Sequence, residues 1–123
     1  MIEKRVCFIG VDGHCGCAYE ELKDLPGVSF CGIAPGVPDE NVSAFAGGSI
    51  PIYTDWREML NTVKPDMAVV STVFGINAEI TVECCKQGVD VFTEKPVAGT
   101  LEELALVEKA VKENGVRLCA VYY

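Results

Sequence analysis

The sequence predicts an α/β fold in which helices cover both faces of a doubly wound, six-stranded parallel sheet with the strand order 3-2-1-4-5-6. Three observations support this prediction. Strand-like and helix-like patterns alternate along the chain, the strands are short and almost continuously apolar, and the connections are short. Because 123 residues are the length of one domain, we expect residues 1–123 to form a single domain of the Rossmann type.

The first half of the chain is predicted to contain three strands separated by turn-forming residues. The apolar run RVCFIGV ends in a glycine-rich turn, and Pro26 and Gly27 end the helical pattern that follows. The third strand contains Pro51, which favours a position at the edge of the sheet. The expected elements are strands over 5–11, 28–34 and 50–53, a helix over 16–25 and a short helix around 39–46.

The second half carries clearer helix boundaries. Residues 55–58 and 100–103 have the pattern of capping boxes, which open helices predicted over 56–63 and 101–114. The buried face of the last helix is expected to consist of Leu101, Leu104, Val107 and Val111. The remaining expected elements are a helix over 78–87, which Asn77 caps and Gly88 ends, and strands over 67–71, 89–92 and 116–121.

Composition and charge argue against several classes of function. The formal net charge of −8 repels nucleic acids and anionic membrane surfaces. No apolar run reaches the ~18 residues that span a bilayer, and the N-terminal residues lack the pattern of a signal peptide. We therefore expect a cytoplasmic protein that binds neither nucleic acid nor a membrane.

The cysteines are predicted to be reduced and mostly buried. There are seven, an odd number, and several lie in predicted apolar strands. His14, Cys15 and Cys17 could instead form a metal or redox site. The Cys-x-Cys spacing differs from the usual Cys-x2-Cys, however, and no second ligand pair occurs. We predict no metal site and keep this cluster as a minor alternative.

The loop after the first strand is the first candidate for a binding site. In an open parallel sheet, ligands bind at the carboxyl ends of the strands, where the strand order reverses. Glycines in this loop would let the backbone approach a pyrophosphate at the start of the next helix. The G-x-G-x-x-G pattern is imperfect, because Gly10 is followed by Asp12 and Cys15, with glycines at 13 and 16 instead. The alternative is a tight turn that needs glycine only for its backbone angles.

The acidic residue that usually holds a ribose at the end of the second strand is missing. This strand ends in Ile33, Ala34, Pro35 and Gly36, and no arginine stands there to receive a 2′-phosphate. Asp39 or Glu40 would have to reach back to take this role. The missing acid is the strongest argument in the sequence against ordinary NAD binding.

The segment FTEKPVA, residues 92–98, places two charges where a buried strand ends. Lys95 precedes a proline and is therefore extended, so its amine is predicted to project into the crevice above the sheet. There it could bind a hydroxyl group or assist proton transfer. Glu94 could pair with Lys95 or with a backbone group. The alternative is a solvated charge pair that only ends the strand.

Two segments resemble the N-terminal dinucleotide-binding domain of the Gfo/Idh/MocA family of glucose–fructose oxidoreductase and inositol dehydrogenase. They are VFTEKPVAGTLEEL with the helix and strand that follow, 91–121, and YTDWREMLNTVKPDMAVVST, 53–72. The resemblance covers essentially the whole chain. It implies binding of NAD or NADP and oxidation or reduction of a hydroxyl on a sugar, an inositol or a related small molecule.

The resemblance also implies roles for individual residues. Lys95 would be the catalytic residue, near the nicotinamide and the substrate. The implied cofactor-binding residues are Gly10, Gly13, His14, Cys15 and Gly16 at the pyrophosphate, Ser71, Thr72 and Val73 at the nicotinamide-side ribose, and Asn77, Glu94, Lys95 and Pro96.

The sequence departs from the family pattern at several positions. Val73 replaces the usual proline, and Asn77, which could simply cap a helix, stands where histidine is frequent. The family's second domain, which supplies the substrate pocket, is expected to be absent because the chain ends at Tyr123. The main hypothesis is therefore a dinucleotide-binding domain that is not catalytic alone and could pair as a homodimer. The alternative is a diverged, non-catalytic module that senses a nucleotide or small ligand, or binds a partner.

Overall fold

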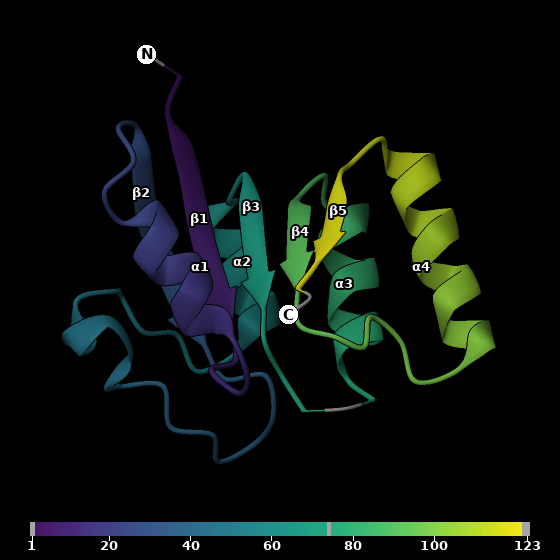
Figure 1. Ribbon diagram of the computed structural model, residues 1–123, viewed down its shortest axis with the longest axis horizontal. Helices are drawn as coiled ribbons and strands as arrows, with labels where there is room; N and C mark the ends of the chain where they lie inside the picture. Colours follow the sequence, from purple (N-terminus) through teal and green to yellow (C-terminus); the bar gives the residue numbers. More distant parts are fainter. Residues whose placement is uncertain (1, 74, 122–123) are drawn as a thin grey trace.

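The computed structural model describes residues 2–73 and 75–121 and shows a parallel sheet flanked by helices (Figure 1). The strands follow the order β2-β1-β3-β4-β5, and all neighbours pair in parallel. This confirms the predicted Rossmann-like α/β fold. The strands are β1 (Lys4–Ile9), β2 (Val28–Ala34), β3 (Met67–Val70), β4 (Asp90–Thr93) and β5 (Leu118–Ala120).

The strand predicted at 50–53 is reduced to one isolated bridge between Ile52 and Ile33. The N–H of Ile33 donates to the carbonyl of Pro51 at 2.9 Å, and the N–H of Tyr53 donates to the carbonyl of Ile33 at 2.8 Å. Pro51 has no N–H with which to extend the ladder. Within the described residues, the structure therefore corrects the predicted six strands to five. It keeps their order, because the bridge lies on β2 at the edge where the third strand was expected.

Helices lie on both faces of the sheet, as predicted. The helix α1 (Cys15–Leu22) lies in front of the sheet in Figure 1, whereas α2 (Trp56–Val63) and α3 (Asn77–Lys86) lie behind it. The helix α4 (Leu101–Asn114) packs against α3. In place of the short helix expected around 39–46, a 3-10 helix, η1 (Phe45–Gly48), is interrupted by left-handed backbone angles.

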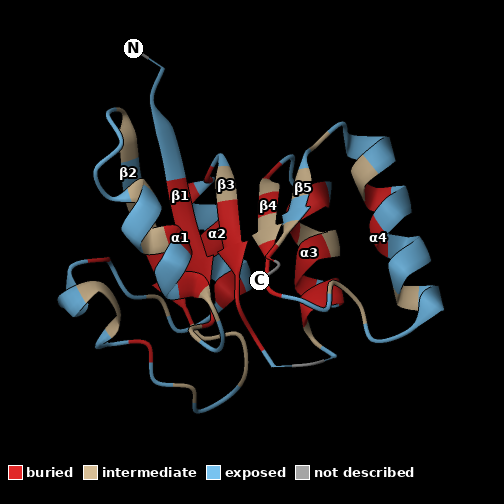
Figure 2. Ribbon diagram, viewed as in Figure 1, coloured by how far each residue is buried: buried red, intermediate tan, exposed pale blue. Residues whose placement is uncertain are grey.

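An apolar core lies on each face of the sheet. Phe8 is fully buried in the core beneath α1, where its ring lies 5.0 to 6.4 Å from those of Tyr19, Phe30 and Phe45. Figure 2 shows that β1 is exposed at its start and buried toward its carboxyl end. The other core includes Cys7, Ile9, Met59, Leu60, Val70, Ile80, Cys84 and Val91.

The buried face of α4 is shifted from the predicted one. Leu101 is 85% exposed and Leu104 is 45% exposed, whereas Val107 and Ala110 are 1% and 5% exposed. The predicted Val111 does pack against the core. The leucines nearest the start of α4 are exposed, and the buried residues of this helix lie nearer its middle. The bounds of this helix, in contrast, are those predicted.

Candidate functional site

The carboxyl ends of β1, β3 and β4 bring the three candidate loops together. The N–H of Asp12 donates to the carbonyl of Ser71 at 3.0 Å, and the N–H of Glu94 donates to the carbonyl of Val70 at 2.7 Å. Gly10 lies so close to the end of β3 that an added Cβ would be 2.4 Å from the carbonyl oxygen of Ser71, the residue after this strand. With its φ of +81°, this position requires glycine.

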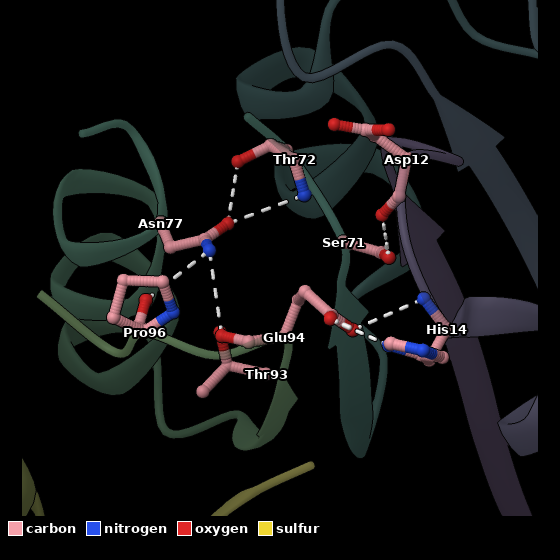
Figure 3. Close-up of polar contacts among 8 residues, drawn as sticks. All are labelled: Asp12, His14, Ser71, Thr72, Asn77, Thr93, Glu94 and Pro96. Atoms are coloured by element: carbon pink, nitrogen blue, oxygen red, sulfur yellow. Dashed lines mark hydrogen bonds and ion pairs between the residues drawn. The ribbon is translucent and has the colours of Figure 1, made fainter. Parts of the chain in front are cut away.

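The start of α1 receives a carboxylate from the loop after β4. Glu94 accepts a hydrogen bond from the backbone N–H of His14 at 3.0 Å, and its Oε1 lies 2.7 Å from Nδ1 of His14 (Figure 3). The side chain of Glu94 is 8% exposed, and it packs so closely on Gly13 that an added Cβ would lie 2.8 Å from its Cδ. Glu94 therefore contacts the glycine-rich loop, at a helix end whose dipole favours negative charge.

Two of the three residues expected to line a ribose turn their side chains into the protein. Ser71 and Thr72 are 1% and 3% exposed, whereas Val73 is 41% exposed. The Ser71 hydroxyl donates to the carbonyl of Asp12. Burial raises the pKa of the neighbouring Cys15 thiol, an effect that a hydrogen bond with Ser71 partly offsets. Beyond β3, the side chain of Val73 is thus the one of these three that reaches the surface.

Asn77 is the hub of the polar contacts between the loops after β3 and β4. Its Oδ1 accepts from both the N–H and the hydroxyl of Thr72, and its Nδ2 donates to the carbonyls of Glu94 and Pro96, each at 3.4 Å (Figure 3). The prediction that Asn77 caps α3 is wrong. Ile76 is the N-cap, and Asn77 is the first helical residue, 1% exposed. Its amide instead fixes the loop that carries Lys95.

The two charges of the EKP segment face different surroundings. Glu94 is buried against α1, whereas Lys95 is exposed at the start of a groove that runs along residues 95–101 to Leu104. The Lys95–Pro96 peptide bond is cis. The exposure of Lys95, two residues after β4, places its side chain at the surface beside the carboxyl edge of the sheet.

Glu40, which the sequence offered only as one of two acids that could reach back, contacts both the segment just past β2 and the first loop. Its Oε1 accepts from the N–H of Gly36 at 2.8 Å, and its Oε2 accepts from the N–H of Val11 at 3.0 Å. Asp39, the other candidate, is exposed, with a φ of +67°. No sequence pattern distinguishes Glu40 from Asp39 as the acid that reaches back. Which of the two does so depends on the path of the turn after β2.

The described residues give no geometry for the metal-site alternative. Within residues 2–73 and 75–121, no three His, Cys, Asp or Glu side chains are placed to hold a metal ion. Cys15 is buried, whereas Cys17 is exposed. In the same part of the chain, no helix has the length and apolar character required to cross a membrane.

Comparisons with known sequences agree with the resemblance. A family model, GFO_IDH_MocA, described as an oxidoreductase family with an NAD-binding Rossmann fold, matches residues 4–123. Glycosyl hydrolase family 109 protein 2 of Akkermansia muciniphila is 30% identical over 114 residues, 81% of this chain and 23% of the relative. The scyllo-inositol 2-dehydrogenase (NADP(+)) of Bacillus subtilis is 35% identical over 72 residues, 58% of this chain and 20% of the relative. The chain therefore spans less than a quarter of these relatives.

Solved structures show the same fold. A Thermotoga maritima protein assigned to the oxidoreductases is 34% identical with a TM-score of 0.86, over 95% of this chain and 38% of that one. The WlbA dehydrogenase of Bordetella pertussis, solved with NADH and UDP-GlcNAcA, is 24% identical with a TM-score of 0.78, over 97% of this chain and 37% of that one. At that lower identity, the likeness shows the fold alone.

Proposed function

This chain belongs to the Gfo/Idh/MocA family of NAD-binding Rossmann-fold oxidoreductases, and we propose that it binds NAD(H) or NADP(H) at the carboxyl edge of its sheet. The observation that carries the proposal is the meeting of three loops there. The glycine-rich loop leads into α1, the loop after β3 supports it, and the loop after β4 adds Lys95. This is the edge at which parallel α/β sheets bind nucleotides.

The residues present fit a dinucleotide. An added Cβ at Gly16 would meet nothing within 4 Å, so the first turn of α1 is open to a ligand and offers backbone N–H groups to phosphate oxygens. The nicotinamide ring, when bound, supplies the hydride acceptor or donor. In this proposal Lys95 binds the reacting hydroxyl and takes part in moving its proton, and Asn77 positions the loop that carries Lys95.

The proposed substrates are sugars, inositols or related small hydroxyl compounds. Support comes from the names of the relatives, one of which is an inositol dehydrogenase. We also propose that the 123-residue domain binds the cofactor without turning over substrate on its own. Hydride transfer requires a substrate held over the cofactor, and Lys95 lies exposed at the surface.

Thermal unfolding with and without NAD+, NADH, NADP+ and NADPH tests cofactor binding. A ligand at ~100 times its dissociation constant stabilises the folded state by ~2.7 kcal/mol, which raises the unfolding temperature by several degrees. Adenosine and nicotinamide at equal concentration are the control ligands, because neither contains the pyrophosphate. If none of the four dinucleotides raises the unfolding temperature at millimolar concentration, the proposal is wrong.

One observation favours the alternative of a diverged, non-catalytic module. The carboxylate of Glu94 accepts the N–H of His14 at the start of α1, where it would repel a phosphate group. Titration calorimetry of the wild type and of Glu94→Gln separates the two cases. Dinucleotide binding by the wild type supports the dehydrogenase domain. Dinucleotide binding by Glu94→Gln but not by the wild type would mean that Glu94 blocks the site. That result is expected of a module that has lost the cofactor.

A further inference from the structure

We propose that Glu40 replaces the missing acid at the end of β2, binds the hydroxyls of the adenosine ribose and makes this chain select NAD(H) over NADP(H). The inference rests on the proposed function, because it concerns the same binding edge. Family membership leaves the choice open, since one relative is named for NADP(+). The choice has to follow from residues of this chain.

The position of the Glu40 carboxylate carries the inference. Its two oxygens accept from Gly36, just past the end of β2, and from Val11, in the loop after β1. These two segments also meet directly, because the N–H of Gly10 donates to the carbonyl of Ala34 at 2.8 Å. The carboxylate therefore lies between the end of β2 and the glycine-rich loop, which is where an acid at the end of β2 would lie in a fold of this type.

The turn that delivers Glu40 is held close to the sheet. An added Cβ at Gly36 would lie 2.0 Å from Cγ2 of Thr72, so the chain there passes against the loop after β3 with no room for a side chain. The N–H of Glu40 donates back to the carbonyl of Val37 at 3.4 Å. The end of β2 itself carries no acidic side chain. The carboxylate comes instead from Glu40, six residues after Ala34.

The chemistry of the carboxylate matches a ribose diol. An ionised carboxylate has about four acceptor sites, and the two backbone N–H groups use only part of them. The remaining sites can accept from two adjacent hydroxyls. The N–H contacts also hold the carboxylate in place, so little side-chain freedom is lost when the ribose binds.

The same carboxylate disfavours a 2′-phosphate. A phosphate at this position would meet the negative charge of Glu40, with Asp39 beside it in sequence. No lysine or arginine occurs between Lys23 and Arg57, so this whole stretch supplies no cation to bind the phosphate. The negative charge of Glu40 and its hydrogen bonds to the ribose therefore both favour NAD(H) over NADP(H).

Titration calorimetry with NAD+ and NADP+ tests the inference on the wild type, Glu40→Gln and the matched control Asp39→Asn. We expect the wild type to bind NAD+ at least ~10 times more tightly than NADP+, and Glu40→Gln to lose about tenfold in NAD+ affinity, the range for a hydrogen bond to a charged group. The preference for NAD+ over NADP+ should be smaller in Glu40→Gln than in the wild type. Asp39→Asn should change this preference less than Glu40→Gln does.

A second measurement needs no variant, in case Glu40→Gln fails to fold. ADP-ribose and its 2′-phosphate, titrated against the wild type, report on the adenosine half alone. We expect the 2′-phosphate to weaken binding at least ~10-fold. A wild type that prefers the phosphorylated ligands, or an unchanged ratio in folded Glu40→Gln, would overturn the inference and leave the proposed function standing. No binding of any nucleotide would overturn both.

Discussion

At the scale of single residues, Asn77 has the most specific role that the structure reveals. Its amide uses both its acceptor and its donor to connect Thr72 with the carbonyls of Glu94 and Pro96. An amide places a carbonyl oxygen and an NH₂ group with two donors side by side on one short side chain. The residue that resembled a helix cap is therefore a link between the loops after β3 and β4.

Asn77→Asp should destabilise the fold by about 1–3 kcal/mol, because an oxygen would then face the two carbonyl oxygens that the amide nitrogen now contacts. Urea unfolding measures this change. Asn61→Asp is the matched control, since Asn61 is exposed on α2, and it should change the stability by at most about 0.5 kcal/mol. Equal effects of the two substitutions would show that the amide contacts of Asn77 do not stabilise the loop.

The sequence predicted which loops would meet but not which side chains would pair within them. The meeting of the loops follows from parallel strands, whose carboxyl ends share one edge. The pair His14 and Glu94 joins residues 80 positions apart, and the contact of Glu40 with Val11 spans 29 positions. Such pairs depend on the exact path of each turn, which no short-range pattern encodes.

At the scale of elements, α4 shows how local signals fix a helix. Thr100 accepts from the N–H of Glu103 at 3.0 Å, as expected for a capping box. The carboxylate of Glu103 accepts from the N–H of Gly99 at 2.9 Å, one residue before the position that an ideal box uses. The cap therefore also holds the end of the loop that carries Lys95.

Thr100→Ala should cost about 1 kcal/mol of stability, because the first turn of α4 loses its side-chain acceptor. Thermal unfolding checks this expectation. Thr62→Ala is the control, since Thr62 is exposed inside α2 and alanine is the better helix former, so that variant should be neutral or more stable. A Thr100→Ala protein as stable as Thr62→Ala would mean that the cap does not contribute.

The sequence predicted the bounds of an element well where its local capping signals agree with its packing in the fold. The bounds of α4 follow from its threonine cap and from Gly115, which has a φ of +62° after the last turn. The strand predicted at 50–53 does not form, because Pro51 can accept a backbone hydrogen bond but has no N–H to donate to a neighbouring strand. The outward position of Leu101 could not be predicted either, because it depends on how α4 packs in the fold and not on the hydrophobic pattern of the helix alone.

At the scale of the whole molecule, the buried thiols make stability depend on alkaline pH. Burial raises the pKa of Cys7 and of Cys84 well above that of a free thiol. The unfolded chain releases these protons near pH 8.5, whereas the folded chain keeps them. These thiols should therefore leave the free energy of unfolding constant below about pH 8.5. Above that pH they should lower it, by up to ~1.4 kcal/mol per pH unit for each thiol.

Denaturant unfolding between pH 7 and pH 10 measures this slope. Cys84→Ala should make the slope less steep, because one buried thiol no longer contributes. Cys119→Ala should leave the slope close to that of the wild type, because Cys119 is exposed. A stability that stays constant up to pH 10, or a slope that Cys119→Ala reduces as much as Cys84→Ala, would contradict this account.

The net charge of −8 should also set the salt dependence of cofactor binding. The loops around the proposed site carry the acids Asp12, Asp39, Glu40 and Glu94 against the single lysine Lys95, so an anionic dinucleotide approaches a surface of like charge. Raising the salt from about 10 mM to about 150 mM shortens the screening length from ~30 Å to ~8 Å and weakens this repulsion.

We therefore expect salt to strengthen binding, about twofold to threefold for NAD+ and more for NADP+ with its additional phosphate. Titration at the two salt concentrations measures the change. The sign is the opposite of that for a protein that binds phosphates through lysines and arginines, whose affinity falls with salt. An affinity that falls with salt would show that Lys95 and the positive end of α1 outweigh the acids around the site.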